Sequence, residues 1–100
     1  MINFSAITGF DWDEGNARKS ERKHAVMQGE AEEVFFNQPL LTVPDDLHSD
    51  VENRFHALGV THAGRLLNIT FTLRANGTLI RVISARSMSR KERQCYEQAF

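Results

Sequence analysis

Two segments that alternate between apolar and polar residues, joined by a short turn, constrain the fold of this chain most strongly. Residues 66–73 alternate from Leu67 onwards, and residues 79–86 begin with the same alternation, which is typical of half-buried β-strands. The dipeptide Asn76-Gly77 lies between them, and both of its residues tolerate the positive φ angles of a type I′ turn. We therefore expect two neighbouring antiparallel strands.

The remaining segments predict helices on either side of a group of strands. Before the hairpin we expect an edge strand at 10–12, helices at 13–24 and 30–36, strands at 40–43 and 51–58, and an acidic loop at 45–50. After the hairpin, Ser89 and Glu92 have the spacing of a capping box, which predicts a C-terminal helix. This order predicts a single α+β domain, 1–100. We expect a twisted antiparallel sheet of four to five strands, with two N-terminal helices and one C-terminal helix on one face.

The composition excludes several classes of protein. Cys95 is the only cysteine, so the chain has no internal disulfide and no cluster of thiolates for a metal, which fits a reducing compartment. No stretch approaches the roughly 20 apolar residues of a membrane span, and the N-terminus lacks the basic start of a signal peptide. We therefore expect a cytoplasmic protein without membrane contact.

Charge is distributed unevenly along the chain, although the net charge is only −1. Residues 27–53 carry seven acids and no Lys or Arg, whereas residues 65–100 carry seven bases and two acids. Residues 16–26 carry four bases and one acid. Such segregation can create a cationic surface that attracts an anionic partner. The two signs could equally meet in the folded protein and cancel, so both outcomes stay open.

Arginines on the predicted strands are the main candidates for chemistry. Arg54, Arg81 and Arg86 lie within strands or at their ends, and apolar residues flank Arg81, where an unpaired charge is costly. Guanidinium groups bind phosphate through two hydrogen bonds and stabilise the charge that builds up during phosphoryl transfer. The alternative for Arg81 is a structural ion pair with Glu52 or Glu92.

A histidine is the candidate proton-transfer group. His24 follows a basic run at the predicted C-terminus of the first helix, where the helix dipole favours the imidazolium form. A helix-capping or packing histidine is the alternative. Tyr96 and Cys95 lie on the apolar side of the last helix and are expected in the core. No histidine spacing is typical of a zinc site, and no glycine-rich nucleotide motif is present, so no metal or other cofactor is expected.

Five blocks of the sequence together resemble the BrnT family of bacterial toxins. These blocks are FDWDEGNARKSERKH, EAEEVF, RFHALG, GRLLNITFTLR and IRVISARSMSRKERQCYE, and they cover about residues 9–98. The resemblance implies a RelE-like fold and the toxin of a type II toxin–antitoxin system, an mRNA interferase that cleaves RNA without a metal. It also implies a BrnA-like antitoxin with a ribbon-helix-helix domain, through which alone the complex would bind operator DNA.

The resemblance also indicates which residues form the site. By position, the family's strand arginines fall on Arg54, Arg65, Arg81 and Arg86, its Lys–His pair on Lys23 and His24, and its helical Glu and Tyr on Glu92 and Tyr96. We expect a catalytic set of His24, Arg54, Arg81 and Arg86, an RNA-binding set of Lys19, Lys23, Arg65 and Arg90, and a supporting pair, Glu92 and Tyr96. Ala25 and Gln28 depart from the family pattern near His24.

RNA cleavage of this kind needs a base for the 2′-hydroxyl, cations on the phosphate and an acid for the leaving 5′-oxygen. The near-neutral bases on the basic side are His24 and His56, of which His24 is preferred. The alternative function is a non-catalytic or degenerate domain that binds an antitoxin or nucleic acid through its basic face. A homodimer is compatible with either function.

Overall fold

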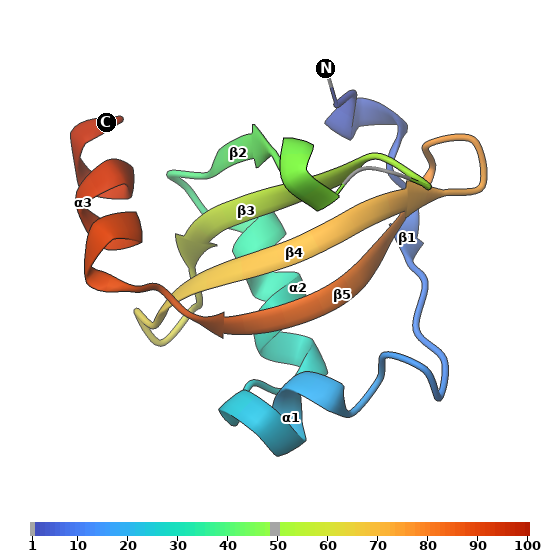
Figure 1. Ribbon diagram of the computed structural model, residues 1–100, viewed down its shortest axis with the longest axis horizontal. Helices are drawn as coiled ribbons and strands as arrows, with labels where there is room; N and C mark the ends of the chain where they lie inside the picture. The colour runs from blue at the N-terminus through green and yellow to red at the C-terminus, as the bar shows by residue number, and fades with distance from the viewer. Residues whose placement is uncertain (1, 49–50) are drawn as a thin grey trace.

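Five strands form one sheet in the computed structural model, which describes residues 2–48 and 51–100. The strands are β1 (Gly9–Phe10), β2 (Leu41–Pro44), β3 (Arg54–Val60), β4 (Leu66–Arg74) and β5 (Leu79–Ser87). Their order across the sheet is β1-β5-β4-β3-β2 (Figure 1). The pairs from β2 to β5 are antiparallel, whereas β1 pairs parallel with β5. The sheet is therefore mixed, where the sequence predicted an antiparallel one.

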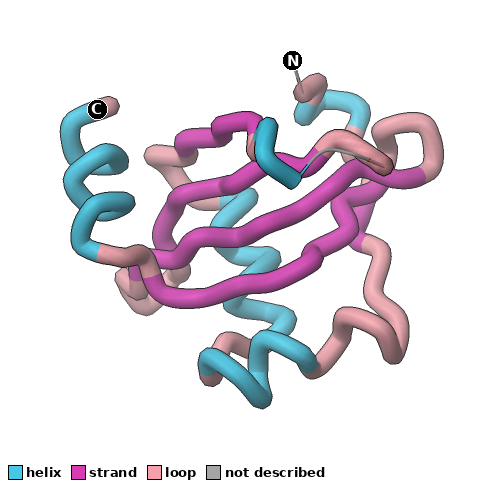
Figure 2. The backbone as a smooth tube through the Cα atoms, viewed as in Figure 1, coloured by secondary structure: helices cyan, strands magenta, loops and turns pink. Residues whose placement is uncertain are grey.

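In the part of the chain that the structure describes, three helices complete the fold, together with short 3₁₀ helices at Phe4–Ala6 and Asp46–His48. The helices are α1 (Lys19–His24), α2 (Gln28–Phe36) and α3 (Arg90–Gln98). Figures 1 and 2 show α2 crossing behind the sheet, α1 beside β5, and α3 at one end of the sheet. The predicted α+β fold, with two N-terminal helices and one C-terminal helix, is confirmed.

The main core lies between α2 and the sheet, and the alternation in β4 creates it. Leu67, Ile69 and Phe71 are fully buried, and Val34 of α2 belongs to the same apolar cluster. The side chains between them in β4 point to the other face, as the two-residue period of a strand requires. The sheet therefore has one apolar face toward α2 and one largely polar face.

Helix α3 packs on the face opposite α2. Leu58 follows the core residue Ala57 in β3, so its side chain points away from α2. It forms a second buried cluster with Met88 and with Tyr96 of α3. The prediction that all the helices lie on one face is therefore wrong. The apolar side of α3 packs against the end of the sheet rather than against the main core.

The hairpin predicted around Asn76-Gly77 is confirmed, but its turn is longer than expected. Arg74 pairs with Leu79, so the connection has four residues rather than two. Ala75 shares the left-handed conformation of the dipeptide, and the three φ angles are 53°, 56° and 83°. The Asn-Gly signal thus marked the position of the turn but not its type.

Helix α1 begins at Lys19, later than predicted, because the residues before it form a turn. Asn16 is buried, and its side-chain amide donates to the carbonyl oxygens of Asp11 and Val82 at 3.0 and 2.8 Å. Its side-chain oxygen accepts the backbone N–H of Asp13 at 2.8 Å. Bonds of this kind compete with helix formation. They also fasten the segment after β1 to β5.

Strand β3 begins at Arg54 and ends at Val60, whereas the alternation predicted a strand at 51–58. The backbone N–H of Asp45 donates to the carbonyl oxygen of Arg54 at 2.8 Å, which closes the connection from β2. Of the predicted acidic loop, Ser49 and Asp50 lie outside the described residues.

A β-bulge in β5 changes which residues share a face of the sheet. Thr70 pairs with Ser84 but Phe71 pairs with Val82, so Ile83 is an extra residue in β5. Val82 and Ala85 are both buried toward the core. In a regular strand, residues three apart would lie on opposite faces.

Candidate nucleic-acid interface

Polar side chains occupy the face of the sheet opposite α2. The register places them in three rows across β3, β4 and β5: Arg54–Thr72–Arg81, His56–Thr70–Ser84 and Leu58–Asn68–Arg86. We call these residues, without Leu58, the polar face. Neighbouring strands lie about 4.8 Å apart and successive rows about 7 Å apart. Arginines from β3 and β5 therefore lie on either side of the hydroxyl-bearing residues in the middle of this face.

The bulge at Ile83 is what puts two of these cations on the same side. Arg81 and Arg86 are five residues apart, so a regular strand would point them to opposite faces. The extra residue brings Arg81 opposite Thr72 and Arg86 opposite Asn68. All four side chains consequently belong to the polar face.

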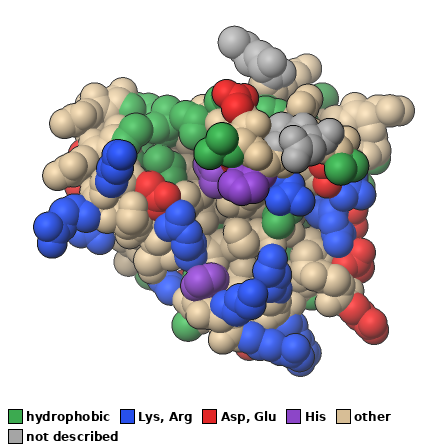
Figure 3. Space-filling model, in the orientation of Figure 1, with side chains coloured by type: hydrophobic (Ala, Val, Ile, Leu, Met, Phe, Trp, Pro, Cys, Tyr) green, Lys and Arg blue, Asp and Glu red, His purple; other side chains and the backbone are tan. Residues whose placement is uncertain are grey.

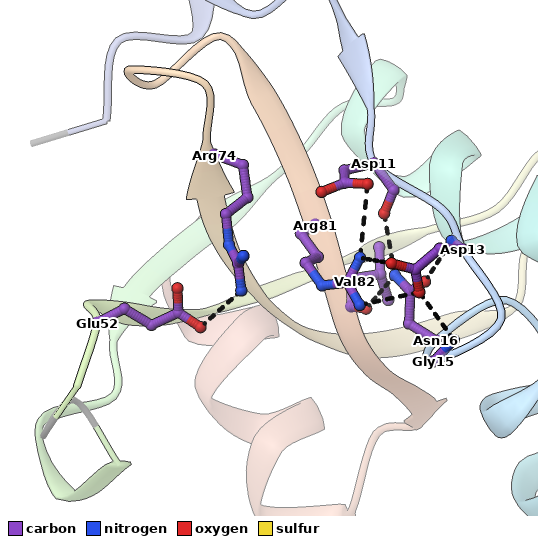
Figure 4. A network of polar contacts seen from close by, with 8 residues as sticks. All are labelled: Asp11, Asp13, Gly15, Asn16, Glu52, Arg74, Arg81 and Val82. Atoms are coloured by element: carbon purple, nitrogen blue, oxygen red, sulfur yellow. Dashed lines mark hydrogen bonds and ion pairs between the residues drawn. The ribbon is translucent and has the colours of Figure 1, made fainter.

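Arg81 is held by two acids from the segment after β1. It donates to both carboxylate oxygens of Asp13 at 3.1 Å and lies 3.5 Å from Asp11 Oδ1 (Figure 4). These hydrogen bonds lower the pKa of Asp13 and raise that of Arg81. The partners predicted from sequence, Glu52 and Glu92, are wrong, because Asn16 anchors the segment after β1 beside β5.

Arg86 is held by Glu92 of α3. Its guanidinium donates to the two carboxylate oxygens at 2.8 and 2.7 Å, and Asn68 donates to one of them at 2.9 Å. Glu92 also closes the capping box, since it accepts the N–H of Ser89 at 2.9 Å. The hydrogen bonds from Arg86, with that of Ser89, lower the pKa of Glu92 to about 2. The helix is thereby tied to the polar face.

Helix α1 extends the cationic surface beyond the edge of β5. The Ser20 hydroxyl accepts the N–H of Ala85 at 2.7 Å, which holds the helix against the strand. The exposed basic residues of this region line a hollow of about 750 Å³ that also contains Asp13. They are Arg18, Lys19, Arg22 and Lys23. Figure 3 shows Lys and Arg side chains gathered over the front of β5 and α1.

The sequence of residues 12–92 matches the family described as a ribonuclease toxin, BrnT, of type II toxin–antitoxin systems. The chain belongs to the BrnT family. It is therefore a ribonuclease toxin, and such a toxin has an RNA substrate and a cognate antitoxin. A comparison with curated proteins gave no match.

Two features are absent from the described part of this BrnT toxin, residues 2–48 and 51–100. No helix there is long and apolar enough to cross a membrane. No group of three or more His, Cys, Asp or Glu side chains there is placed to hold a metal ion.

Arg65 lies away from the other strand arginines of this BrnT toxin. Its guanidinium donates to the carbonyl oxygens of His24 and Ala25, at 3.2 and 2.8 Å, and to Glu30 at 3.2 Å. Cationic side chains at a helix C-terminus stabilise its last carbonyl groups. This placement gives Arg65 a capping role between α1 and α2.

We expect Arg65→Ala to lower the free energy of unfolding by about 1–2 kcal/mol, because three hydrogen-bond acceptors lose their donor. Urea unfolding monitored by circular dichroism measures the change. The exposed Lys91 provides the control, since Lys91→Ala is expected to change the free energy by less than about 0.5 kcal/mol. Equal effects of the two substitutions would contradict the capping role.

The other predicted site residues of the toxin lie in different surroundings. His24 is exposed at the end of α1, and Arg90 is exposed in the first turn of α3. Tyr96 is buried, and its hydroxyl donates to the carbonyl oxygen of Pro39 at 2.6 Å. Cys95 is exposed, contrary to the prediction that it is buried.

Low pH should weaken the ion pair between Arg86 and Glu92 in this toxin. The pKa of Glu92 falls from 4.5 to about 2 on folding, so the stabilisation is complete above pH 4.5 and disappears as the pH falls towards 2. We expect Glu92→Gln to be less stable than the wild type by about 2 kcal/mol at pH 7. Urea unfolding should show this difference in the free energy of unfolding becoming smaller between pH 4.5 and 2. A difference that does not depend on pH would contradict the ion pair.

Sequence reasoning missed the contribution of the segment after β1. In the middle row of the polar face it named His56 as a candidate base but missed Thr70 and Ser84. Asp11 and Asp13 lack a motif that links them to Arg81, because the contact depends on tertiary structure. The bulge had a local signal. Val82 and Ile83 are consecutive apolar residues, which break the alternation and indicate an irregularity in the strand.

Proposed function

We propose that this BrnT toxin binds and cleaves RNA on its polar face, without a metal ion. Arg54, Arg81 and Arg86 would hold the non-bridging oxygens of the scissile phosphate. The proposal is supported by the position of these arginines, which come from two strands and surround the hydroxyl groups of Thr70 and Ser84. Preorganised cations of this kind stabilise the charge that develops during phosphoryl transfer.

The acids that pair with the arginines orient them rather than block them. A guanidinium group has five N–H donors, and Asp13 accepts from Arg81 through only two of its nitrogens. The side chain of Asp13 is 58% exposed, so its ion pair is a weak competitor for a phosphate. Arg86 donates to both oxygens of Glu92 and, at 3.1 Å, to the carbonyl oxygen of Ser87, which uses three of its five N–H donors. Arg81 and Arg86 can thus each receive a phosphate oxygen while their directions stay fixed.

The cations of α1 would bind the phosphates next to the scissile one. Lys19 and Lys23 stand beside the edge of β5, and Arg90 stands at the start of α3. Exposed lysines and arginines at this distance neutralise the nucleic-acid backbone without reading its sequence. We expect them to raise the affinity for long RNA more than the rate of cleavage.

Incubation of the purified protein with RNA in the presence of EDTA tests this function. Cleavage that continues in the chelator, with a 2′,3′-cyclic phosphate on one product and a 5′-hydroxyl on the other, supports it. Intact RNA with a shifted band on a native gel would instead support the alternative, a domain that only binds nucleic acid. RNA that is neither cut nor bound would contradict both functions.

We infer that the cognate antitoxin is BrnA-like and carries a ribbon-helix-helix domain, and that the pair acts in the cytoplasm. Family membership supports this inference, since a type II toxin is neutralised by a protein partner. Operator DNA would be bound only through the antitoxin. Co-expression with the neighbouring reading frame, followed by co-purification and sizing, tests the partner and reveals whether the toxin is a monomer or a homodimer in the complex.

A further inference from the structure

A hydrogen-bonded group around His56 lies in the middle row of the polar face. The Nε2 atom of its ring is 3.1 Å from Asp45 Oδ2, and its Nδ1 atom is 3.1 Å from both Thr70 Oγ1 and Asn68 Oδ1. The His56 side chain is 27% exposed, so a ligand on the polar face can reach it. Figure 3 shows histidine side chains at the surface of this region.

Asp45 is suited to hold this ring. Its side chain is only 10% exposed, and it also contacts Nδ1 of His48 at 3.1 Å. Burial alone would raise the pKa of Asp45, but the hydrogen bonds and charges of His48 and His56 outweigh burial and lower it. Asp45 is therefore an anion at neutral pH, and it leaves Nδ1 of His56 directed toward β4.

The groups near Nδ1 can serve both protonation states of the ring. The Thr70 hydroxyl can donate to Nδ1 when this atom carries no proton. The amide nitrogen of Asn68 donates to Glu92, so the amide oxygen faces Nδ1 of His56. This oxygen can accept a hydrogen bond from Nδ1 when Nδ1 carries a proton. A ring with partners in both states needs no rearrangement when it takes up or releases a proton.

We propose that His56 is the catalytic base of RNA cleavage in this chain and that Asp45 is its positioning residue. The inference rests on the proposed function of the polar face. His56 shares this face with Arg54 and Arg81, whereas His24 is exposed at the end of α1. Proximity to the arginines that hold the phosphate decides between the two histidines.

The step balances without a further reactant. Nδ1 of His56 takes the proton of the RNA 2′-hydroxyl, in place of the hydrogen bond from Thr70. The 2′-oxygen forms a bond to phosphorus while the bond from phosphorus to the 5′-oxygen breaks. The leaving 5′-oxygen takes a proton from water, and the imidazolium then releases its proton to the solvent. The products are a 2′,3′-cyclic phosphate and a 5′-hydroxyl.

Several charged groups surround His56 and enter any pH dependence. Asp45 and His48 belong to the connection between β2 and β3, Arg54 lies on β3, and the pair Arg86–Glu92 lies beyond Asn68. Two of these groups, His48 and His56, are imidazoles, the class of side chain that exchanges protons most readily near neutral pH. Variants at both positions therefore separate their contributions.

Steady-state cleavage of an RNA oligonucleotide in EDTA tests the inference. We expect His56→Gln to lower kcat by about 10²–10⁴-fold with little change in KM, because a general base acts on the transition state. The dependence of kcat/KM on the protonation of this base should be lost in the variant. Asp45→Asn should lower kcat by about tenfold or more. Imidazole added to His56→Ala should restore part of the activity, which a structural role would not allow.

His62 provides the matched control, since it is exposed and lies in the connection between β3 and β4. His62→Gln should keep kcat within about threefold of the wild type. The inference is overturned if the kcat of His56→Gln also stays within threefold of the wild type. If His24→Gln alone loses activity, His24 rather than His56 is the catalytic base. In both cases the proposed function survives as long as arginine variants of the polar face are inactive. A wild-type protein that leaves RNA intact would refute the function and the inference together.

If the His56 variants melt below the assay temperature, the comparison moves to Asp45→Asn and to His48→Gln. The first should lose activity and the second should retain most of it, because Asp45 contacts the ring of His56 directly, whereas His48 contacts Asp45. Equal activity of these two variants and the wild type would overturn the inference.

Discussion

Replacing Arg81 with alanine is expected to lower RNA cleavage by about 10²–10³-fold, the usual effect of removing one preorganised donor from a charged transition state. Arg81 shares a row with Arg54 and Thr72 in the polar face. The fold should survive, because the acids it leaves behind, Asp11 and Asp13, are 33% and 58% exposed and remain hydrated. A cleavage assay and growth arrest on expression measure the loss.

Arg74 is the control for this substitution. It is also a strand arginine with an acid partner, since its guanidinium lies 3.1 Å from Glu52 (Figure 4), but it lies at the hairpin end of β4. Arg74→Ala should retain most of the activity. Arg86→Ala should behave like Arg81→Ala. If both polar-face variants cleave RNA at the wild-type rate, the arginine site is wrong, whatever happens to toxicity.

Replacing Phe71 with alanine is expected to have the largest effect on stability, about 3–5 kcal/mol. Phe71 is fully buried in β4, and its ring lies 5.1 Å from that of Phe35 and 5.5 Å from that of Phe55. A domain of this size has a total stability of roughly 5–15 kcal/mol, so the variant should be close to unfolding at 37 °C. The urea midpoint measures the change.

Phe36 is the control for this substitution, because it is also a phenylalanine but is not buried. It is 73% exposed although its ring contacts that of Phe10, so Phe36→Ala should cost less than about 1 kcal/mol. A cost at Phe71 no larger than that at Phe36 would contradict the position of the main core.

Local patterns predicted the elements of this fold well. The hairpin followed from alternation around Asn76-Gly77, and the C-terminal helix followed from the capping box of Ser89 and Glu92, whose two hydrogen bonds are present. Each of these signals involves residues close together in the chain. The early start predicted for α1 failed because Asn16 finds a partner in Val82, 66 residues away, and no local propensity reports that contact.

For the candidate site, the sequence indicated the arginines on the strands but not the acids that pair with them. The basic strands indicated a surface for phosphate, and Arg81 and Arg86 do share one face. The acid of Arg81 is 68 residues away in the sequence, and the parallel pairing of β1 brings it there. The acidic and basic blocks do meet in places, as in the pair of Arg65 and Glu30. That contact removes Arg65 from the polar face, which charge counting alone could not predict.

The extra residue in β5 has a consequence for how this protein can change in length. Deleting Ile83 would leave Arg81 and Arg86 four residues apart in a regular strand, still on the same side of the sheet. Inserting a residue between them would turn Arg86 towards the apolar layer unless a second irregularity formed. Natural or engineered variants should therefore accept shortening of this segment more readily than lengthening, even though every charged residue is retained in both cases.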